Sequence, residues 1–293
     1  MKRSLLVGLT LMLVVTLMLG SMPISFAQKI PTMPSPSQYN SPVEYQRATG
    51  KKIARFNESP MLAELVKTGK LPPVEKRLPS DPLVIVPVEE VGQYGGTARV
   101  FSNSLTGYGE AECLIGFEGL VKLGPDTTSV IPNIAKSWKY TDGGKTLTIY
   151  LRKGIKWSDG VPFTADDILF WWEDVVLNDE LTPVKPVTWS PGGKLMTVEK
   201  VDNYTIRMKF SVSHPFAILY LAHGWGTQAS CYYPKHYSKK FHPKYTPIEE
   251  LNKRAKAEGF DNWWQLFGKY NGFFGGGGAN VEIGAPTLQA FMV

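Results

Sequence analysis

Residues 132–174 read PNIAKSWKYTDGGKTLTIYLRKGIKWSDGVPFTADDILFWWED, and their spacing sets out a strand, a turn and a helix in that order. From Thr146 to Leu151, threonine or tyrosine alternates with leucine or isoleucine. This period of two predicts a strand with one buried face. The Asp142–Gly144 run before it supplies residues that tolerate positive φ, so a tight turn is expected there.

A second turn and a helix follow the strand. Trp157 to Gly160 reads WSDG, a turn sequence, and Thr164 stands three residues before Asp167. That spacing fits a capping box with Asp in place of the commoner Glu. Apolar residues then recur at helical intervals, which predicts an amphipathic helix from Thr164 to Asn178.

The order of these residues resembles the signature of the family 5 extracellular solute-binding proteins, the peptide-, nickel- and oligosaccharide-type binding proteins of bacterial ABC importers. Weaker likeness continues at residues 92–97, 234–237 and 241–245. The residues that carry the resemblance are Ala135, Ser137, Trp138, Asp142, Gly143, Leu151, Arg152, Gly154–Trp157, Ser158–Gly160 and Pro162–Asp167. We interpret the motif itself as a folded corner of one lobe, not as a contact surface for ligand.

The resemblance implies an α/β fold of the periplasmic-binding-protein class II type, with a mixed sheet and flanking helices. It implies a substrate-binding component that captures peptides or oligosaccharides outside the cytoplasmic membrane and delivers them to ABC permease subunits. A monomer with no cofactor, no metal and no catalytic role is expected. Relatives are much longer than this chain, which stops abruptly at Val293, so only the first lobe is expected here, with the second lobe missing and binding of solute weak.

The amino-terminal residues 1–27 are typical of a secretory signal peptide. Lys2 and Arg3 precede an apolar run from Leu5 to Leu19, and small residues stand before a cleavage point at Gln28. The run is shorter than the roughly 20 residues that span a bilayer, so a retained membrane anchor is the less favoured alternative. Residues 28–90 then form a Pro-rich, extended lead-in with one short helix at Pro60–Lys70, and residues 91–293 form the lobe.

Composition excludes several classes of protein. With 43% hydrophobic and 12% aromatic residues the chain can form a packed core. The formal charge of +6 falls to +4 without Lys2 and Arg3, and no basic cluster points to nucleic acid. The two cysteines, Cys113 and Cys231, are either bridged after export or two buried thiols, and the sequence leaves both alternatives open.

Catalytic and metal-binding patterns are weak. The four histidines have no metal-ligand spacing, and Gly275–Gly278 lacks the following Lys-Ser or Lys-Thr of a phosphate loop. Asp166 and Glu173 belong to paired carboxylates such as a glycosidase needs, but they fall on the start and polar face of a predicted helix. A secreted glycan-active hydrolase and a membrane-tethered interaction module remain the alternative functions.

A solute-binding cleft needs aromatic walls and a few polar groups. The resemblance places Ser102 and Asn103, in the loop after the first strand at residues 97–102, at the cleft wall. Trp225 is flanked by glycines and Trp189 precedes Pro191-Gly192-Gly193, so either ring could face a planar ligand. For both tryptophans the alternative is a position in the lobe core.

Overall fold

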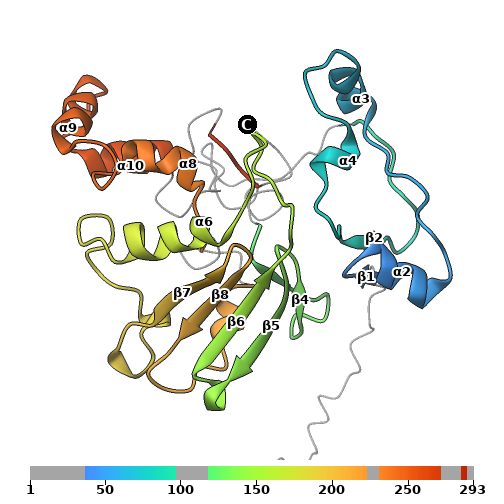
Figure 1. The fold of residues 1–293 in the computed structure, drawn as a ribbon, viewed down its shortest axis with the longest axis horizontal. Helices are drawn as coiled ribbons and strands as arrows, with labels where there is room; N and C mark the ends of the chain where they lie inside the picture. Colours follow the sequence, from blue (N-terminus) through green and yellow to red (C-terminus); the bar gives the residue numbers. More distant parts are fainter. Residues whose placement is uncertain (1–36, 97–117, 223–230, 272–284, 289–293) are drawn as a thin grey trace, which may run out of the picture. The chain divides into compact units, whose positions relative to one another are not determined.

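The computed structural model describes residues 37–96, 118–222, 231–271 and 285–288. Its central feature is a four-stranded sheet with the strand order β5-β6-β8-β7 (Figure 1). The strands span Ala135–Thr141 (β5), Thr146–Leu151 (β6), Thr197–Asp202 (β7) and Thr205–Lys209 (β8). Thr148 of β6 lies opposite Lys139 of β5 and Arg207 of β8, so β6 is hydrogen-bonded along both of its edges.

The predicted turn, strand and helix are confirmed. Asp142, Gly143 and Gly144 form the short helical turn η1, and all three have positive φ, at 53°, 61° and 85°. After β6, helix α6 (Ala165–Leu169) begins at a capping box formed by Thr164 and Asp167. The helix continues without a break into the π-helical segment η2 (Phe170–Val176), two residues short of the predicted end.

The alternation in β6 separates the core from an outer face. Leu147 and Ile149 are fully buried, and Leu151 is 3% exposed, as part of the main hydrophobic core. Tyr150, on the opposite face, is 40% exposed. Thr148 shares that outer face but is buried, because the long side chains of Lys139 and Arg207 flank it.

The α/β class is confirmed, with helices packed against the sheet. Every strand pair among the described residues is antiparallel. The parallel pairing of a mixed sheet is therefore not seen in this part of the chain. The predicted first strand, at residues 97–102, lies outside the described residues.

Further elements complete the lobe around this sheet. A short antiparallel pair precedes it, and further helices follow in the described residues after residue 214. These elements are β3 (Val121–Leu123), β4 (Val130–Pro132), η3 (Val187–Trp189), η4 (Pro191–Gly193), α7 (Ala217–Tyr220), α8 (Lys235–Ser238), η5 (Lys239–Phe241), α9 (Ile248–Ala257) and α10 (Trp263–Asn271).

The described part of the lead-in contains more regular structure than its composition suggests. Strands β1 (Ser37–Tyr39) and β2 (Val84–Val86) pair with each other. The expected helix is present as α3 (Pro60–Lys67). Two further helices, α2 (Pro42–Thr49) and α4 (Val74–Arg77), were not predicted. We call residues 37–96 the arm.

The signal for α2 was present in the sequence. Ser41 is its N-cap and accepts a hydrogen bond from the backbone N–H of Glu44, while Pro42 is the first helical residue. Serine before proline, with glutamate three residues after the serine, is a strong helix start. The surrounding Pro and Ser residues masked this pattern.

Candidate ligand-binding region

The described residues contain one of the four predicted ligand-binding residues. Ser102, Asn103 and Trp225 lie outside them. Trp189, in η3, is fully buried. Its ring meets the ring of Trp171 edge-on at 6.0 Å between centroids, and that of Tyr220 at 6.3 Å. This position favours the core alternative for Trp189, and the four assignments stay predictions.

The WSDG turn of the family signature closes a buried aromatic cluster. The backbone N–H of Gly160 donates to the carbonyl of Trp157, and Gly160 has a φ of 88°, which glycine adopts without strain. Trp157, Phe163 and Tyr232 pack edge to face with centroids 5.3–5.8 Å apart. All three side chains are at most 2% exposed. These residues of the motif therefore belong to the core. This agrees with the interpretation of the motif as a folded corner and not as a contact surface for ligand.

Asp167 joins the start of α6 to a segment 68 residues further on. One carboxylate oxygen accepts from the backbone N–H of Thr164 at 2.8 Å, and the other accepts from that of Lys235 at 3.0 Å. Burial raises the pKa of Asp167 to about 6, although both backbone hydrogen bonds oppose the rise. This carboxyl group therefore links two segments of the chain, and it takes up its proton at a higher pH than an exposed aspartate does.

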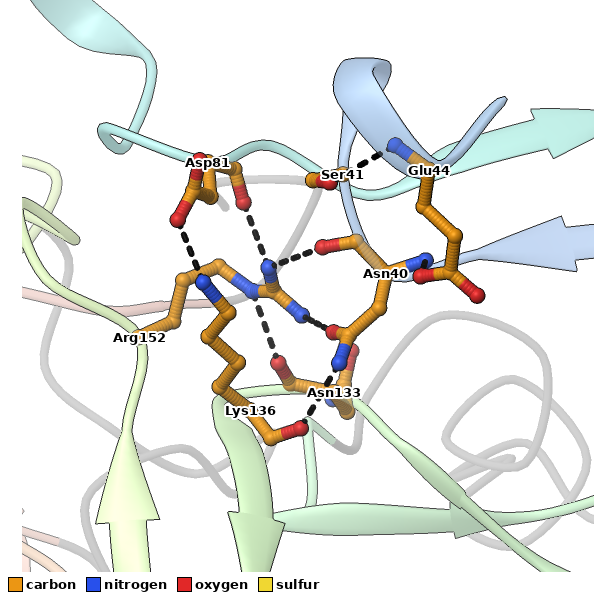
Figure 2. A network of polar contacts seen from close by, with 7 residues as sticks. All are labelled: Asn40, Ser41, Glu44, Asp81, Asn133, Lys136 and Arg152. Atoms are coloured by element: carbon orange, nitrogen blue, oxygen red, sulfur yellow. Dashed lines mark hydrogen bonds and ion pairs between the residues drawn. The ribbon is translucent and has the colours of Figure 1, made fainter. Parts of the chain in front are cut away.

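Arg152, directly after β6, is the buried centre of a polar network (Figure 2). Its side chain is 2% exposed. The guanidinium donates to the backbone carbonyl of Asn40 at 2.8 Å, to the side-chain oxygen of Asn40 at 2.5 Å, and to the backbone carbonyls of Asp81 at 2.5 Å and Asn133 at 3.2 Å. A planar guanidinium can satisfy several acceptors at once in this way.

The same network fastens the arm to the sheet at a second point. The Lys136 ammonium of β5 pairs with the Asp81 carboxylate at 2.5 Å, and the Asn40 amide donates to the Lys136 carbonyl at 2.9 Å (Figure 2). Asn40 itself is held by Glu44, which accepts from its backbone N–H at 2.8 Å. Two loops of the arm, around Asn40 and Asp81, are therefore fixed against the ends of β5 and β6.

Beside this network is a hollow of about 810 Å³, which we call the end hollow. Its lining mixes two tyrosine rings with carboxylate, amide, hydroxyl and ammonium groups. The Lys153 ammonium stands 5.8 Å from the centre of the Tyr204 ring, within cation–π range. The lining residues are Ser80, Asp81, Lys136, Tyr150, Leu151, Lys153, Asp202, Asn203, Tyr204 and Thr205.

Sequence reasoning missed both the Arg152 network and the end hollow. Arg152 was part of the recognised motif, but nothing in the sequence pairs it with Asn40 or Asp81. A buried arginine must find several acceptors, and the chain offers many candidates. Nothing in the sequence indicated that Asp202 and Asn203 line a hollow.

Of the two carboxylates considered for catalysis, Glu173 is exposed and Asp166 is paired with lysine side chains. Asp166 pairs with the ammonium of Lys200 at 2.7 Å and with that of Lys235 at 3.8 Å. Within the described ranges, no group of three or more His, Cys, Asp or Glu side chains is placed to hold a metal ion. Cys231 is fully buried, and because Cys113 lies outside those ranges the question of a disulfide stays open.

The chain is similar to known binding proteins. Residues 129–269 match the model described as bacterial extracellular solute-binding proteins, family 5 middle. The periplasmic alpha-galactoside-binding protein of Rhizobium meliloti (strain 1021) is 36% identical over 231 residues, covering 71% of this chain and 33% of that protein.

Two solved structures share the fold. One, titled oligopeptide-binding protein OppA, has a TM-score of 0.75 at 39% identity and covers 87% of this chain and 38% of its own. The other is the periplasmic binding protein MelB from Agrobacterium fabrum C58 in complex with stachyose. Its TM-score is 0.60 at 29% identity, and the match covers 83% of this chain and 36% of MelB.

These matches confirm the resemblance: residues 129–269 match the middle region of the family 5 extracellular solute-binding proteins, and the chain is similar to periplasmic binding proteins over most of its length. It spans about a third of the length of the relatives that it matches. In the part of the chain that the structure describes, no helix has the length and apolar character needed to cross a bilayer.

Proposed function

We propose that this protein is the substrate-binding component of an ABC importer and that its ligand is an oligosaccharide of the α-galactoside class. The main support is the 36% identity to an alpha-galactoside-binding protein, which extends over 71% of this chain. MelB supports the same ligand class, because the stachyose in its structure carries α-linked galactose. A protein that binds and releases its ligand unchanged needs no catalytic group, so an enzymatic role is not proposed.

The proposed mechanism is capture between two lobes that close on the ligand by a hinge motion. Affinity then comes from enclosing the sugar and excluding water, with aromatic faces and a few polar groups fixing its orientation. Ser102, Asn103 and Trp225 are the proposed contributions of this lobe to the cleft. The closed form would dock, as a monomer, on permease subunits outside the cytoplasmic membrane.

Export is part of the proposal. Residues 1–27 would be removed as a signal peptide, so mass spectrometry of the secreted protein should find an amino terminus at Gln28. A mature protein that still carries the apolar run from Leu5 to Leu19 would support the membrane-tethered alternative instead.

A peptide ligand is the second candidate. The structure titled oligopeptide-binding protein OppA has a higher TM-score and identity to this chain than MelB has. Fold similarity alone does not select the ligand, because function resides in the site and not in the architecture. The two ligand classes must therefore be compared directly.

Thermal unfolding in the presence of candidate ligands makes this comparison, on the polypeptide encoded by the whole reading frame. At about a thousand times its Kd, a ligand stabilises the folded state by about 4 kcal/mol, which raises Tm by several degrees. We expect this shift with raffinose and stachyose, and none with the β-linked disaccharide lactose or with tetra-alanine. A shift with the peptide alone would favour the second candidate, and no shift with any of them would contradict both.

A further inference from the structure

The outer face of the four-stranded sheet carries a second hollow, of about 560 Å³, which adjoins the end hollow. The two hollows have Tyr150, Asp202 and Thr205 in common. We call the combined surface the sheet trough. Besides the lining of the end hollow, it includes Lys139, Thr141, Asp142, Thr146, Thr148, Val201, Arg207 and Lys209.

Tyr150 stands at the point where the two hollows meet. It belongs to β6, which has neighbours on both edges, and yet it is 40% exposed. Its cross-strand partners are Ser137 and Thr205, which are too small to cover an aromatic ring. An exposed tyrosine face flanked by hydroxyl groups can stack against the C–H face of a sugar ring, since the phenol offers an apolar body and a polar tip.

The charges of the trough are nearly balanced. Lys136 pairs with Asp81 at 2.5 Å, and Glu199, next to the trough on β7, pairs with Lys209 at 2.5 Å and Arg207 at 3.5 Å. Hydrogen bonds to its backbone neighbours, Tyr204 first, lower the pKa of Asp202, so this carboxylate is charged at neutral pH. The five cations Lys136, Lys139, Lys153, Arg207 and Lys209 thus stand beside the four carboxylates Asp81, Asp142, Asp202 and Glu199.

This balance bears on the kind of ligand. An anionic polymer would need a clear excess of positive charge, which the compensated pairs do not offer. A peptide strand would need an open backbone edge or apolar side-chain pockets. Tyr150 lies in a central strand whose backbone is already paired, and the aliphatic lining is limited to Leu151 and Val201. Carboxylates, hydroxyls, an amide and ammonium groups around aromatic rings match the hydroxyl groups of a neutral sugar chain.

We propose that the sheet trough is an accessory binding site for a neutral oligosaccharide, with Tyr150 as the stacking platform. Asp202, Asn203 and Thr205, on the β7–β8 side of Tyr150, would accept and donate hydrogen bonds to sugar hydroxyls, and Arg207, further along β8, would donate to them. The site is additional to the interlobe cleft and does not depend on which ligand the cleft takes. It would be shallow and weak, holding a sugar chain at the surface.

The test is an NMR titration of the ¹⁵N-labelled 293-residue chain with stachyose and, separately, with cellotetraose and tetra-alanine. We expect saturable shifts of the amides of Tyr150, Thr205 and Arg207 with one or both sugars, with a Kd on the order of 1–10 mM. Tyr150→Ala should weaken binding by about tenfold, which corresponds to about 1.4 kcal/mol, and Tyr150→Phe should retain it. Phe216→Ala, which removes an aromatic ring that is 61% exposed outside the trough, should leave the Kd unchanged.

Three results would overturn the proposal: no saturable shift in the folded chain up to about 50 mM sugar, binding that survives Tyr150→Ala, or equal binding of tetra-alanine. Circular dichroism of each variant separates loss of the site from loss of the fold. The readout is local to the trough residues, so failure here would leave the proposed cleft function standing, and failure of the cleft proposal would leave this one standing.

Discussion

The guanidinium of Arg152 donates to both the backbone carbonyl and the side-chain oxygen of Asn40, a residue 112 positions earlier in the chain. Asn40 is in turn fixed by Glu44 of α2 and donates its amide to the Lys136 carbonyl of β5. One buried side chain inside the family motif, directly after β6, thus attaches the arm to the sheet. It also positions Asp81, which forms a wall of the end hollow.

Replacing Arg152 by alanine should release the arm. The variant leaves the carbonyl groups of Asn40, Asp81 and Asn133 without their donor, and we expect a loss of about 2–4 kcal/mol in the free energy of unfolding. Arg152→Lys should recover less than half of this, because an ammonium cannot form the same fork of hydrogen bonds. Urea unfolding measures the loss, and trypsin should cleave the variant faster after Lys51 and Lys52, which are exposed.

Arg47→Ala is the matched control, because Arg47 is an exposed arginine of the arm. It should change the free energy of unfolding by no more than about 0.5 kcal/mol, the range of surface substitutions. Trypsin should cleave it after Lys51 and Lys52 as slowly as it cleaves the wild type. An Arg152→Ala protein as stable as this control, with unchanged cleavage, would show that the network does not hold the arm.

The carboxyl group of Asp167 should make stability depend on pH in an unusual direction. Its folded pKa is raised from 3.8 to about 6, mainly by burial. The folded state therefore holds this proton more tightly than the unfolded state does. The contribution is fully present below about pH 4 and is lost as the pH rises to about 6, with a total change of about 3 kcal/mol.

The difference in unfolding free energy between wild type and Asp167→Asn isolates this effect, because the other titrating groups cancel. As the pH is raised from 4 to 7, we expect the wild type to lose stability relative to Asp167→Asn. The neighbouring variant Asp166→Asn should show no such trend, since that carboxylate is paired with Lys200 and partly exposed. A pH-independent difference for Asp167→Asn would rule out the raised pKa.

Substitutions of Trp189 can distinguish its two possible roles, as a core residue or as a residue that contacts the ligand. Since the ring is fully buried against Trp171 and Tyr220, Trp189→Ala should cost about 3–5 kcal/mol. Trp189→Phe keeps an aromatic ring and should fold with a smaller loss. If Trp189 is a core residue, this variant binds sugar as the wild type does. If Trp189→Phe instead lowers the affinity strongly without a change in stability, Trp189 contacts the ligand.

The hydrolase alternative makes a separate prediction about Asp166. Because Lys200 and Lys235 pair with this carboxylate at the surface, Asp166→Ala should cost no more than about 1 kcal/mol. Prolonged incubation of stachyose with the protein should release no galactose, as followed by chromatography. Galactose release that Asp166→Ala or Glu173→Ala abolishes would establish the enzyme.

Local structure could be predicted from the sequence because its causes are local. The alternation of Thr146–Leu151, the capping pair Thr164 and Asp167, and the positive φ values around Gly143 each depend on neighbours within a few residues. Helix α2 had such a signal too, in Ser41, Pro42 and Glu44, but it lay in a segment whose composition suggested an extended chain.

The contacts that shape the lobe surface could not be predicted in this way. Arg152 meets Asn40 and Asp81 across 112 and 71 residues, and Trp157 meets Tyr232 across a similar span. No periodicity encodes such proximity. For Trp189 the sequence allowed both a cleft and a core position, and only the packing around it could favour one of them.

Isothermal titration calorimetry of the polypeptide from the whole reading frame, with stachyose in the syringe, measures the proposed binding of an α-galactoside itself. We expect one tight site per chain, with a Kd of about 1 µM or below, unaffected by an excess of tetra-alanine. Absence of binding heat with stachyose, together with saturable binding of the peptide, would contradict the proposal.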